Sequence, residues 1–191
     1  MRAVKNILSG ALNGVVAISI CVTGWQAAVA KEGDILSQEK FEQELCMAEN
    51  LYHEARGDNV AGMYAVADVV LNRVQDNRYP NTVCEVVKQG PVRESWKTRQ
   101  DESLPDSERV YYPVRNQCQF SWFCDGKSDE VGDETAWALS QEIAYRIMND
   151  GRYRGITEGA THYHATYVNP SWNREMTTVG RIGSHIFYRW D

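Results

Sequence analysis

The stretch that most constrains this chain is the run MAENLYHEARGD at residues 47–58. Its apolar residues recur at three- and four-residue spacing, which is the pattern of one buried helix face. Gly57 predicts the end of that helix, and Asp58 with Asn59 predicts the N-cap of the next one. Glu54 adjoins the apolar positions, so its carboxyl should leave the helix beside the apolar face rather than opposite it.

Two interpretations of Glu54 follow from this pattern. A carboxyl held against apolar and aromatic neighbours loses hydration, which raises its pKa and suits it to act as a general acid near neutral pH. Most glutamates on helices are instead ordinary solvated charges. The helix pattern alone favours the solvated charge, and the wider sequence context favours the general acid.

The first thirty residues have the organisation of a signal peptide. Arg2 and Lys5 precede an apolar stretch at residues 7–22, and Ala-Val-Ala at residues 28–30 is a small-residue cleavage site. The apolar stretch is short and interrupted for a membrane span. We therefore expect an exported chain, periplasmic or secreted, with no stable membrane insertion after cleavage.

Beyond the signal peptide at residues 1–30, we expect a lead-in at residues 31–44 and one domain at residues 45–191. No linker, repeat or low-complexity run marks a second domain. The net charge is −6, and the leader holds only cations, so the exported chain is more acidic still. Without a basic stripe to displace counterions from phosphates, nucleic acid is excluded as a partner.

Four cysteines follow the leader: Cys46, Cys84, Cys118 and Cys124. An even number in an exported chain predicts two disulfides, which could pair in three ways. We favour Cys118–Cys124, closing the loop between them, and Cys46–Cys84, tying the first helix to a later one. A metal site is the weaker alternative, because no close cysteine pair stands beside a histidine at the usual ligand spacing.

The remaining patterns predict further helices and a short sheet. The helices are expected at residues 60–74, 82–89 and 133–150, and the strands at residues 161–168, 177–182 and 185–190. Residues 90–116 are polar and turn-rich with little periodicity, which is typical of a long functional or mobile loop. The expected fold class is α+β, predominantly helical, with a small C-terminal β-hairpin or sheet.

The segment NQCQFSWFC at residues 116–124 combines aromatic rings with amide and hydroxyl groups. Sugars bind to such mixtures, ring face against ring face, with polar groups holding the hydroxyls. We therefore take Trp122, Gln119 and Ser121 as candidate binding residues, with the alternative that the aromatics only cap the core. Asn72, at the end of an expected helix, is a further candidate contact.

Histidines offer a rival chemistry. His162 and His164 lie two apart on an expected strand and would share a face, where His53 or His185 could complete a zinc site. A zinc hydrolase also needs a base, and the sequence has no His-Glu-x-x-His motif. We expect no metal and no cofactor, with the zinc-dependent hydrolase as the lesser alternative.

Several blocks carry a family resemblance: HEARGD at 53–58, AVADVVLNR at 65–73, YPNTV at 79–83, QFS at 119–121, ATHY at 160–163 and IGSHIFY at 182–188. In this order they resemble the SleB-type cell wall hydrolases, the family named for spore-cortex-lytic enzymes. The resemblance spans about residues 45–190. It implies a lysozyme-like, transglycosylase-like catalytic domain with Glu54 as its acid, and Tyr163 joins the candidate substrate contacts.

The resemblance also implies the reaction. The family cleaves the bond between N-acetylmuramic acid and N-acetylglucosamine in peptidoglycan, which makes glycan strands the expected partner. Hydrolysis by two carboxylates would need a partner for Glu54, and Asp58, Asp68 and Glu49 are candidates that nothing in their setting marks. A lytic transglycosylase needs only one acid, so we favour that reaction while leaving hydrolysis open.

Two positions depart from the family pattern: Asp58 stands where Glu is usual, and His53 where Tyr or Gly is frequent. The spore role is not carried over. A different class of function also remains, a non-catalytic periplasmic glycan-binding or structural module in which Glu54 is a helix-end charge. An unknown activator protein is a partner that the sequence leaves open.

Overall fold

The computed structural model describes residues 19–190, with side chains from residue 33 onward. The chain divides after Lys40 into two compact units, and the second holds every element that follows the first helix. Helix α1 (Ser19–Ala55) runs through residues 31–44, so the expected lead-in is helical throughout. Residues 1–18 of the expected signal peptide lie outside the described residues. Within the described part, no helix is both long and apolar enough to cross a membrane.

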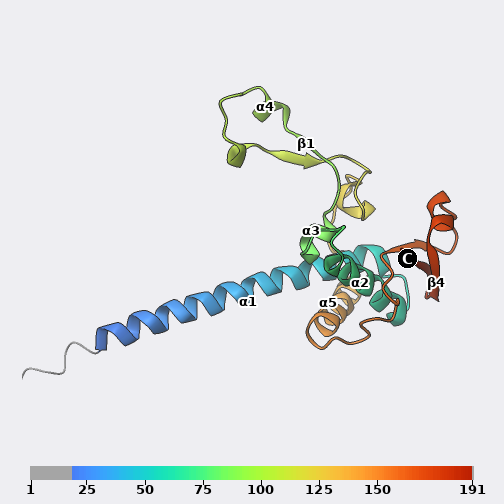
Figure 1. Ribbon diagram of the computed structural model, residues 1–191, viewed down its shortest axis with the longest axis horizontal. Coiled ribbons are helices and arrows are strands. Elements are labelled where there is room, and N and C mark those ends of the chain that lie inside the picture. Colours follow the sequence, from blue (N-terminus) through green and yellow to red (C-terminus); the bar gives the residue numbers. More distant parts are fainter. Residues whose placement is uncertain (1–18, 191) are drawn as a thin grey trace, which may run out of the picture. The chain divides into compact units, whose positions relative to one another are not determined.

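The main core is helical. The end of α1 packs with α2 (Val60–Gln75), α3 (Val83–Val87) and α5 (Glu134–Asn149), and α2 contacts both α3 and α5 (Figure 1). Asn59, Thr82 and Asp133 cap α2, α3 and α5, each accepting a hydrogen bond from the backbone amide three residues on. The cap predicted at Asn59 is confirmed, and the three helices lie within a few residues of their expected bounds.

Two disulfides hold the helical part together. Cys46 of α1 is bonded to Cys84 of α3, across 38 residues of sequence. Cys118 is bonded to Cys124 and closes the turn that contains the short 3-10 helix η2 (Ser121–Cys124). These are the two pairings that we favoured among the three possible ones.

Residues 90–116, expected as a long loop, contain an antiparallel hairpin. Strand β1 (Val92–Glu94) pairs with β2 (Tyr111–Pro113), and between them lie the one-turn helix α4 (Trp96–Arg99) and the 3-10 helix η1 (Asp106–Glu108). Figure 1 shows this hairpin standing apart from the helices α2, α3 and α5. Its strands have mostly exposed side chains and hence no apolar alternation, which is why the sequence pattern did not reveal them.

The C-terminal part forms the expected sheet. Strands β3 (His162–Ala165), β4 (Thr177–Ile182) and β5 (His185–Arg189) make an antiparallel sheet in the order β3-β5-β4, with the 3-10 helix η3 (Ser171–Glu175) between β3 and β4. A second apolar cluster joins this sheet to α2 through Val69 and Phe187. Tyr163 of β3 packs against both this cluster and the helical core, so the sheet places its hydroxyl near the end of α1.

Candidate active site

Glu54 lies in the last turn of α1, where its side chain is partly buried. The hydroxyl of Tyr163, 109 residues further along the chain, donates a hydrogen bond to Glu54 Oε2 at 3.3 Å. Burial raises the pKa of Glu54 above its ordinary value, although the Tyr163 hydroxyl and the charge of Arg73 act against that shift. Burial also raises the pKa of Tyr163, so its hydroxyl keeps its proton and remains a donor.

Arg73, in the last turn of α2, is a buried cation close enough to Glu54 to act on its charge. Its Nε donates to the backbone oxygen of Thr161 at 2.8 Å, and its guanidinium carbon lies 5.3 Å from the ring centres of both Tyr79 and Phe120. Among the described residues, its Nη1 has no hydrogen-bond partner. The guanidinium is therefore held in place, and its charge acts on the Glu54 carboxyl without a hydrogen bond between the two side chains.

A cleft of about 720 Å³ opens beside Glu54. One wall is the end of α1, with Tyr52, His53, Glu54 and Arg56, and the other is the segment from Ser121 to Asp133. The second wall is fastened to the first, because the Tyr52 hydroxyl accepts hydrogen bonds at 3.0 Å from the backbone amides of Gly132 and Asp133. A cleft of this size suits an extended polar ligand such as a sugar chain.

The three candidate binding residues of the aromatic loop, Gln119, Ser121 and Trp122, lie in different environments. Ser121 is exposed and lines the cleft, whereas Gln119 is exposed outside the cleft lining. Trp122 is only 9% exposed, its indole N–H donates to Asn50 Oδ1 at 3.0 Å, and its ring stacks on His53 with centres 4.5 Å apart. Trp122 therefore belongs mainly to the core and reaches the cleft with an edge, so it offers no open ring face to a sugar.

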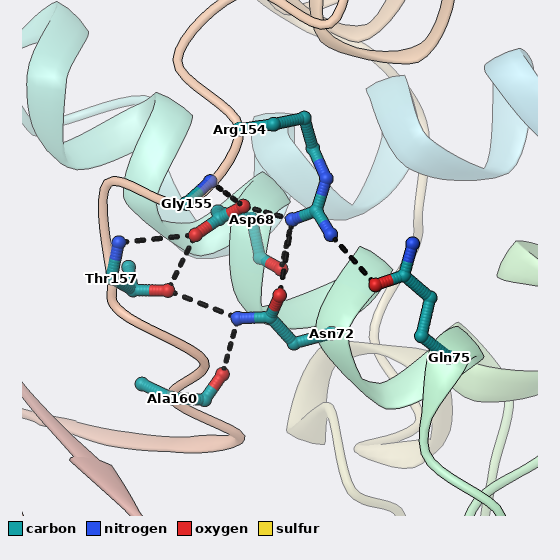
Figure 2. Close-up of polar contacts among 7 residues, drawn as sticks. All are labelled: Asp68, Asn72, Gln75, Arg154, Gly155, Thr157 and Ala160. Carbon is teal, nitrogen blue, oxygen red and sulfur yellow. Dashed lines mark hydrogen bonds and ion pairs between the residues drawn. The ribbon is translucent and has the colours of Figure 1, made fainter.

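Asn72 lies in a network that holds the protein together. Its amide donates to Thr157 Oγ1 and to the backbone oxygen of Ala160, and its Oδ1 accepts from Arg154, as Figure 2 shows. With its donors and acceptor engaged, Asn72 has little left for a substrate, and it is absent from the lining of the cleft beside Glu54. The expectation that Asn72 contacts substrate came from its position at a helix end, and it stays a prediction for a side chain that the structure shows engaged in this network.

Two of the three candidates for a second carboxylate, Asp58 and Asp68, are engaged in hydrogen bonds. Asp68 is fully buried and accepts hydrogen bonds from Arg154, from the amides of Gly155 and Thr157 and from the Thr157 hydroxyl (Figure 2). Neither Asp68 nor Glu49 lines the cleft beside Glu54. Asp68 therefore acts as the anchor between α2 and the segment that leads into β3.

Asp58 binds the turn between β4 and β5. Its carboxylate accepts from the amide and hydroxyl of Ser184, from the amide of Asn59 and from His185 at 3.0 Å. Burial acts to raise the pKa of Asp58, but these hydrogen bonds outweigh it and hold the pKa below its usual value. A side chain at Gly62 or at Gly183 would collide with this carboxylate, which explains both glycines. Asp58 is thus a structural group of the sheet.

The cleft carries carboxylates that the sequence patterns did not single out. Asp125, Asp129, Glu130 and Asp133 line the wall opposite α1, together with Lys127. The only signal for them was an acidic run directly after the aromatic loop. The pKa of Asp125 is lowered because it accepts hydrogen bonds from the Lys127 backbone and side chain.

The histidines have separate partners. His185 contacts Asp58, His164 Nε2 lies 2.9 Å from the Tyr188 hydroxyl, and His162 Nδ1 lies 3.0 Å from the Thr161 hydroxyl. No three metal-ligating side chains gather at one point among the residues that the structure describes. The zinc-dependent alternative therefore has no arrangement of ligands to support it.

Comparison with known proteins identifies the family of this chain. A family model described as "Cell Wall Hydrolase" matches residues 57–188. The chain belongs to the cell wall hydrolase family. The match begins three residues after Glu54, so the family model does not itself cover that residue.

Individual relatives agree with the family. A spore cortex-lytic enzyme of Halalkalibacterium halodurans is 28% identical over 142 residues, which is 74% of this chain and 33% of the relative, so the chain spans about a third of that protein's length. The catalytic domain of the germination-specific lytic transglycosylase SleB from Bacillus anthracis has a TM-score of 0.50 at 24% identity, covering 77% of this chain and 93% of that domain. The catalytic domain of Bacillus cereus SleB has a TM-score of 0.49 at 24% identity, over 78% and 91% of the two chains. Family and lysozyme-like fold are thus as the sequence predicted.

Proposed function

We propose that this cell wall hydrolase cleaves peptidoglycan glycan strands at the bond between N-acetylmuramic acid and N-acetylglucosamine, with Glu54 as its general acid and base. One observation carries the proposal: Glu54 lines the cleft, and its burial raises its pKa above the ordinary value. A general acid for a glycosidic oxygen needs a proton at neutral pH and access to a long polar ligand. Burial shifts the pKa of Glu54 in the direction of the first requirement, and the position of Glu54 in the cleft lining meets the second.

The proposed reaction has two proton transfers. Glu54 first gives its proton to the glycosidic oxygen, so the bond to C1 of the muramic acid breaks and the N-acetylglucosamine leaves as an alcohol. The Glu54 carboxylate then takes the proton of the muramic acid C6 hydroxyl as that oxygen attacks C1, which closes a 1,6-anhydro ring. Glu54 ends protonated, so no water and no second carboxylate is consumed.

Tyr163 and Arg73 support the charged half of this cycle. The Tyr163 hydroxyl already donates to Glu54, and the buried guanidinium of Arg73 lowers the cost of the carboxylate. Burial favours the protonated acid, whereas the Tyr163 hydroxyl and the Arg73 charge favour the carboxylate base, and the proposed cycle uses both forms of Glu54.

The second carboxylate decides between transglycosylation and hydrolysis. The engagement of Asp58 and Asp68 in structural hydrogen bonds favours the single-acid route, as does the absence of Glu49 from the cleft lining. A hydrolase would have to draw its base from the acidic wall at residues 125–133. Ser121 and the exposed edge of Trp122 are the proposed sugar contacts in the cleft, with Gln119 beyond it.

The remaining proposals concern place and partners. Membership of a cell wall hydrolase family and two disulfides support export to the periplasm or beyond, after removal of residues 1–30. The polymer of the cell wall would then be the substrate, and an activator protein could act on the chain there.

The test is a digest of purified sacculi by residues 31–191, beside the Glu54→Gln variant, with soluble products read by mass spectrometry. Muropeptides lighter than the reducing products by one water, formed by the wild type and abolished in the variant, are the expected result. Reducing muramic ends would replace transglycosylation with hydrolysis. Equal turnover by Glu54→Gln would remove Glu54 from the mechanism, and a folded wild type without products would favour the binding module.

A further inference from the structure

The hairpin at residues 92–113 is held together by its own hydrogen bonds and an ion pair. Its strands pair in register, the amide of Ser95 donates to the Val110 oxygen at 2.7 Å, and Arg109 forms an ion pair with Glu94 at 2.8 Å. Its base is fastened to the disulfide-closed turn, because Gly90 lies so close to Cys118 that a side chain there would be crowded. A segment ordered in this way can present side chains in fixed positions.

The side chains that the hairpin presents are unusual for a surface. Five large apolar or aromatic residues are exposed on it: Val92, Trp96, Val110, Tyr111 and Tyr112. Trp96 is 59% exposed and Tyr112 58%. Tyr111 and Tyr112 are neighbours on one strand and point to opposite faces, so the five residues do not form a single surface. Trp96 and Tyr112 do line one common pocket, and exposed rings that meet in a pocket mark a binding site.

This pocket of about 300 Å³ is lined by Arg93, Glu94, Ser95, Trp96, Arg99 and Tyr112. Arg93 stands directly opposite Tyr112 across the two strands, so the cation and the ring share one face. The charge of Glu94 is balanced by Arg109. Arg93 and Arg99 are exposed and have no salt bridge within the described residues, although the charge of Arg99 also acts on Glu94 and helps to lower its pKa. The pocket therefore combines two exposed guanidinium groups with two aromatic rings.

This combination selects the chemistry of the ligand. Guanidinium groups bind carboxylates through paired hydrogen bonds, and the neighbouring rings accept apolar side chains or the faces of peptide groups. An uncharged glycan would have no use for the two cations. A nucleic acid would meet the overall charge of −6. A short peptide that bears carboxylates fits the pocket best.

We propose that the hairpin is a second binding site, which takes the carboxylate-bearing peptide stems of the cell wall polymer. The choice of polymer rests on the proposed function of the Glu54 cleft. The hairpin then binds the peptide stems of the cross-linked wall. This binding site is separate from the cleft in which the glycan is cut.

The test measures binding rather than turnover, in a Glu54→Gln background so that the polymer stays intact. Binding to purified sacculi is compared with binding to stem-free strands of poly-N-acetylglucosamine, because an amidase would leave a lactyl carboxylate on every muramic acid. The variant Arg93→Gln/Arg99→Gln removes both pocket cations. Lys97→Gln is the matched control, because Lys97 is an exposed cation of α4 outside the pocket lining.

We expect the double variant to bind sacculi about tenfold more weakly, as for the loss of two exposed charge-assisted contacts. Lys97→Gln should bind like its parent, and all three proteins should bind the stem-free strands equally. Equal binding of sacculi by all three would overturn the inference and leave a protein partner as the reason for the exposed surface. An equal loss on stem-free strands would also overturn it. Turnover by the wild type tests the Glu54 mechanism separately, so the two failures are distinguishable.

Discussion

Replacing Arg154 by methionine tests the idea that Asp68 is the structural anchor of the site. Asp68 is fully buried, and Arg154, with a side chain 24% exposed, is the cation paired with it (Figure 2). Arg154 also donates to Asn72 and Gln75, so one side chain joins α2 to the segment that leads into β3. The methionine keeps much of the aliphatic volume and removes only the charge and the hydrogen bonds.

The loss of folding stability in Arg154→Met can be estimated from the hydrogen bonds that Asp68 retains. Removing one partner of a buried ion pair costs about 3–5 kcal/mol. Asp68 retains the amides of Gly155 and Thr157 and the Thr157 hydroxyl, which argues for the lower end, about 3 kcal/mol. In a chain of this size, each kcal/mol lowers the melting temperature by about 2–4 °C, so we expect a decrease of about 6–12 °C.

The assay is thermal unfolding followed by circular dichroism at neutral pH, with Arg78→Met as matched control. Arg78 also pairs with an aspartate, Asp76, but its side chain is 49% exposed, so its removal should hardly change the melting temperature. A decrease for Arg154→Met no larger than that for Arg78→Met would refute the assignment of Asp68 as an anchor. Activity should fall as well, because β3 carries the Tyr163 that contacts Glu54.

Two further predictions concern stability. Because burial raises the pKa of Glu54 above its ordinary value of 4.5, the folded chain holds a proton that the unfolded chain has lost, and ionisation costs stability as pH rises through the folded pKa. Glu54→Gln should therefore melt higher than the wild type at neutral pH, with the gain disappearing below 4.5, and a gain independent of pH would contradict this. Replacing Cys46 and Cys84 by serine should cost about 4 kcal/mol, and replacing Cys118 and Cys124 about 2 kcal/mol, because the loops span 38 and 6 residues. Denaturant titrations measure the two losses, and the reverse order would show that strain or packing outweighs loop length.

Much of the architecture was visible in the sequence because it depends on near neighbours. The caps at Asn59 and Thr82 act on amides only three residues away, so their sequence signature is complete in itself. The helices around them follow from apolar spacing, and the strands near Gly183 from alternation. The position of Glu54 beside an apolar face was likewise local, and its burial follows from that face packing into the core.

The hairpin at residues 92–113 and the role of Trp122 were not visible in this way. A strand with two exposed faces has no apolar alternation to detect. An aromatic residue beside polar neighbours is equally consistent with a sugar platform and with a core position. The burial of Trp122 and its hydrogen bond to Asn50, 72 residues earlier, place most of the side chain in the core, and its contact with a sugar stays a prediction.

The sequence by itself identified the family and the fold class, favoured one of three cysteine pairings and singled out Glu54 as the candidate acid. Only the tertiary structure shows which carboxylates are already engaged in hydrogen bonds. Asp58 binds Ser184, 126 positions away in the sequence, and Asp68 binds Thr157, 89 positions away. The physical reason is that a carboxylate is claimed by whichever donors the fold brings within hydrogen-bond distance, and at such separations those donors leave no local pattern. The cleft likewise depends on contacts between residues distant in the sequence. The backbone amides of Gly132 and Asp133 donate to the Tyr52 hydroxyl and so hold the acidic wall against the end of α1 that carries Glu54.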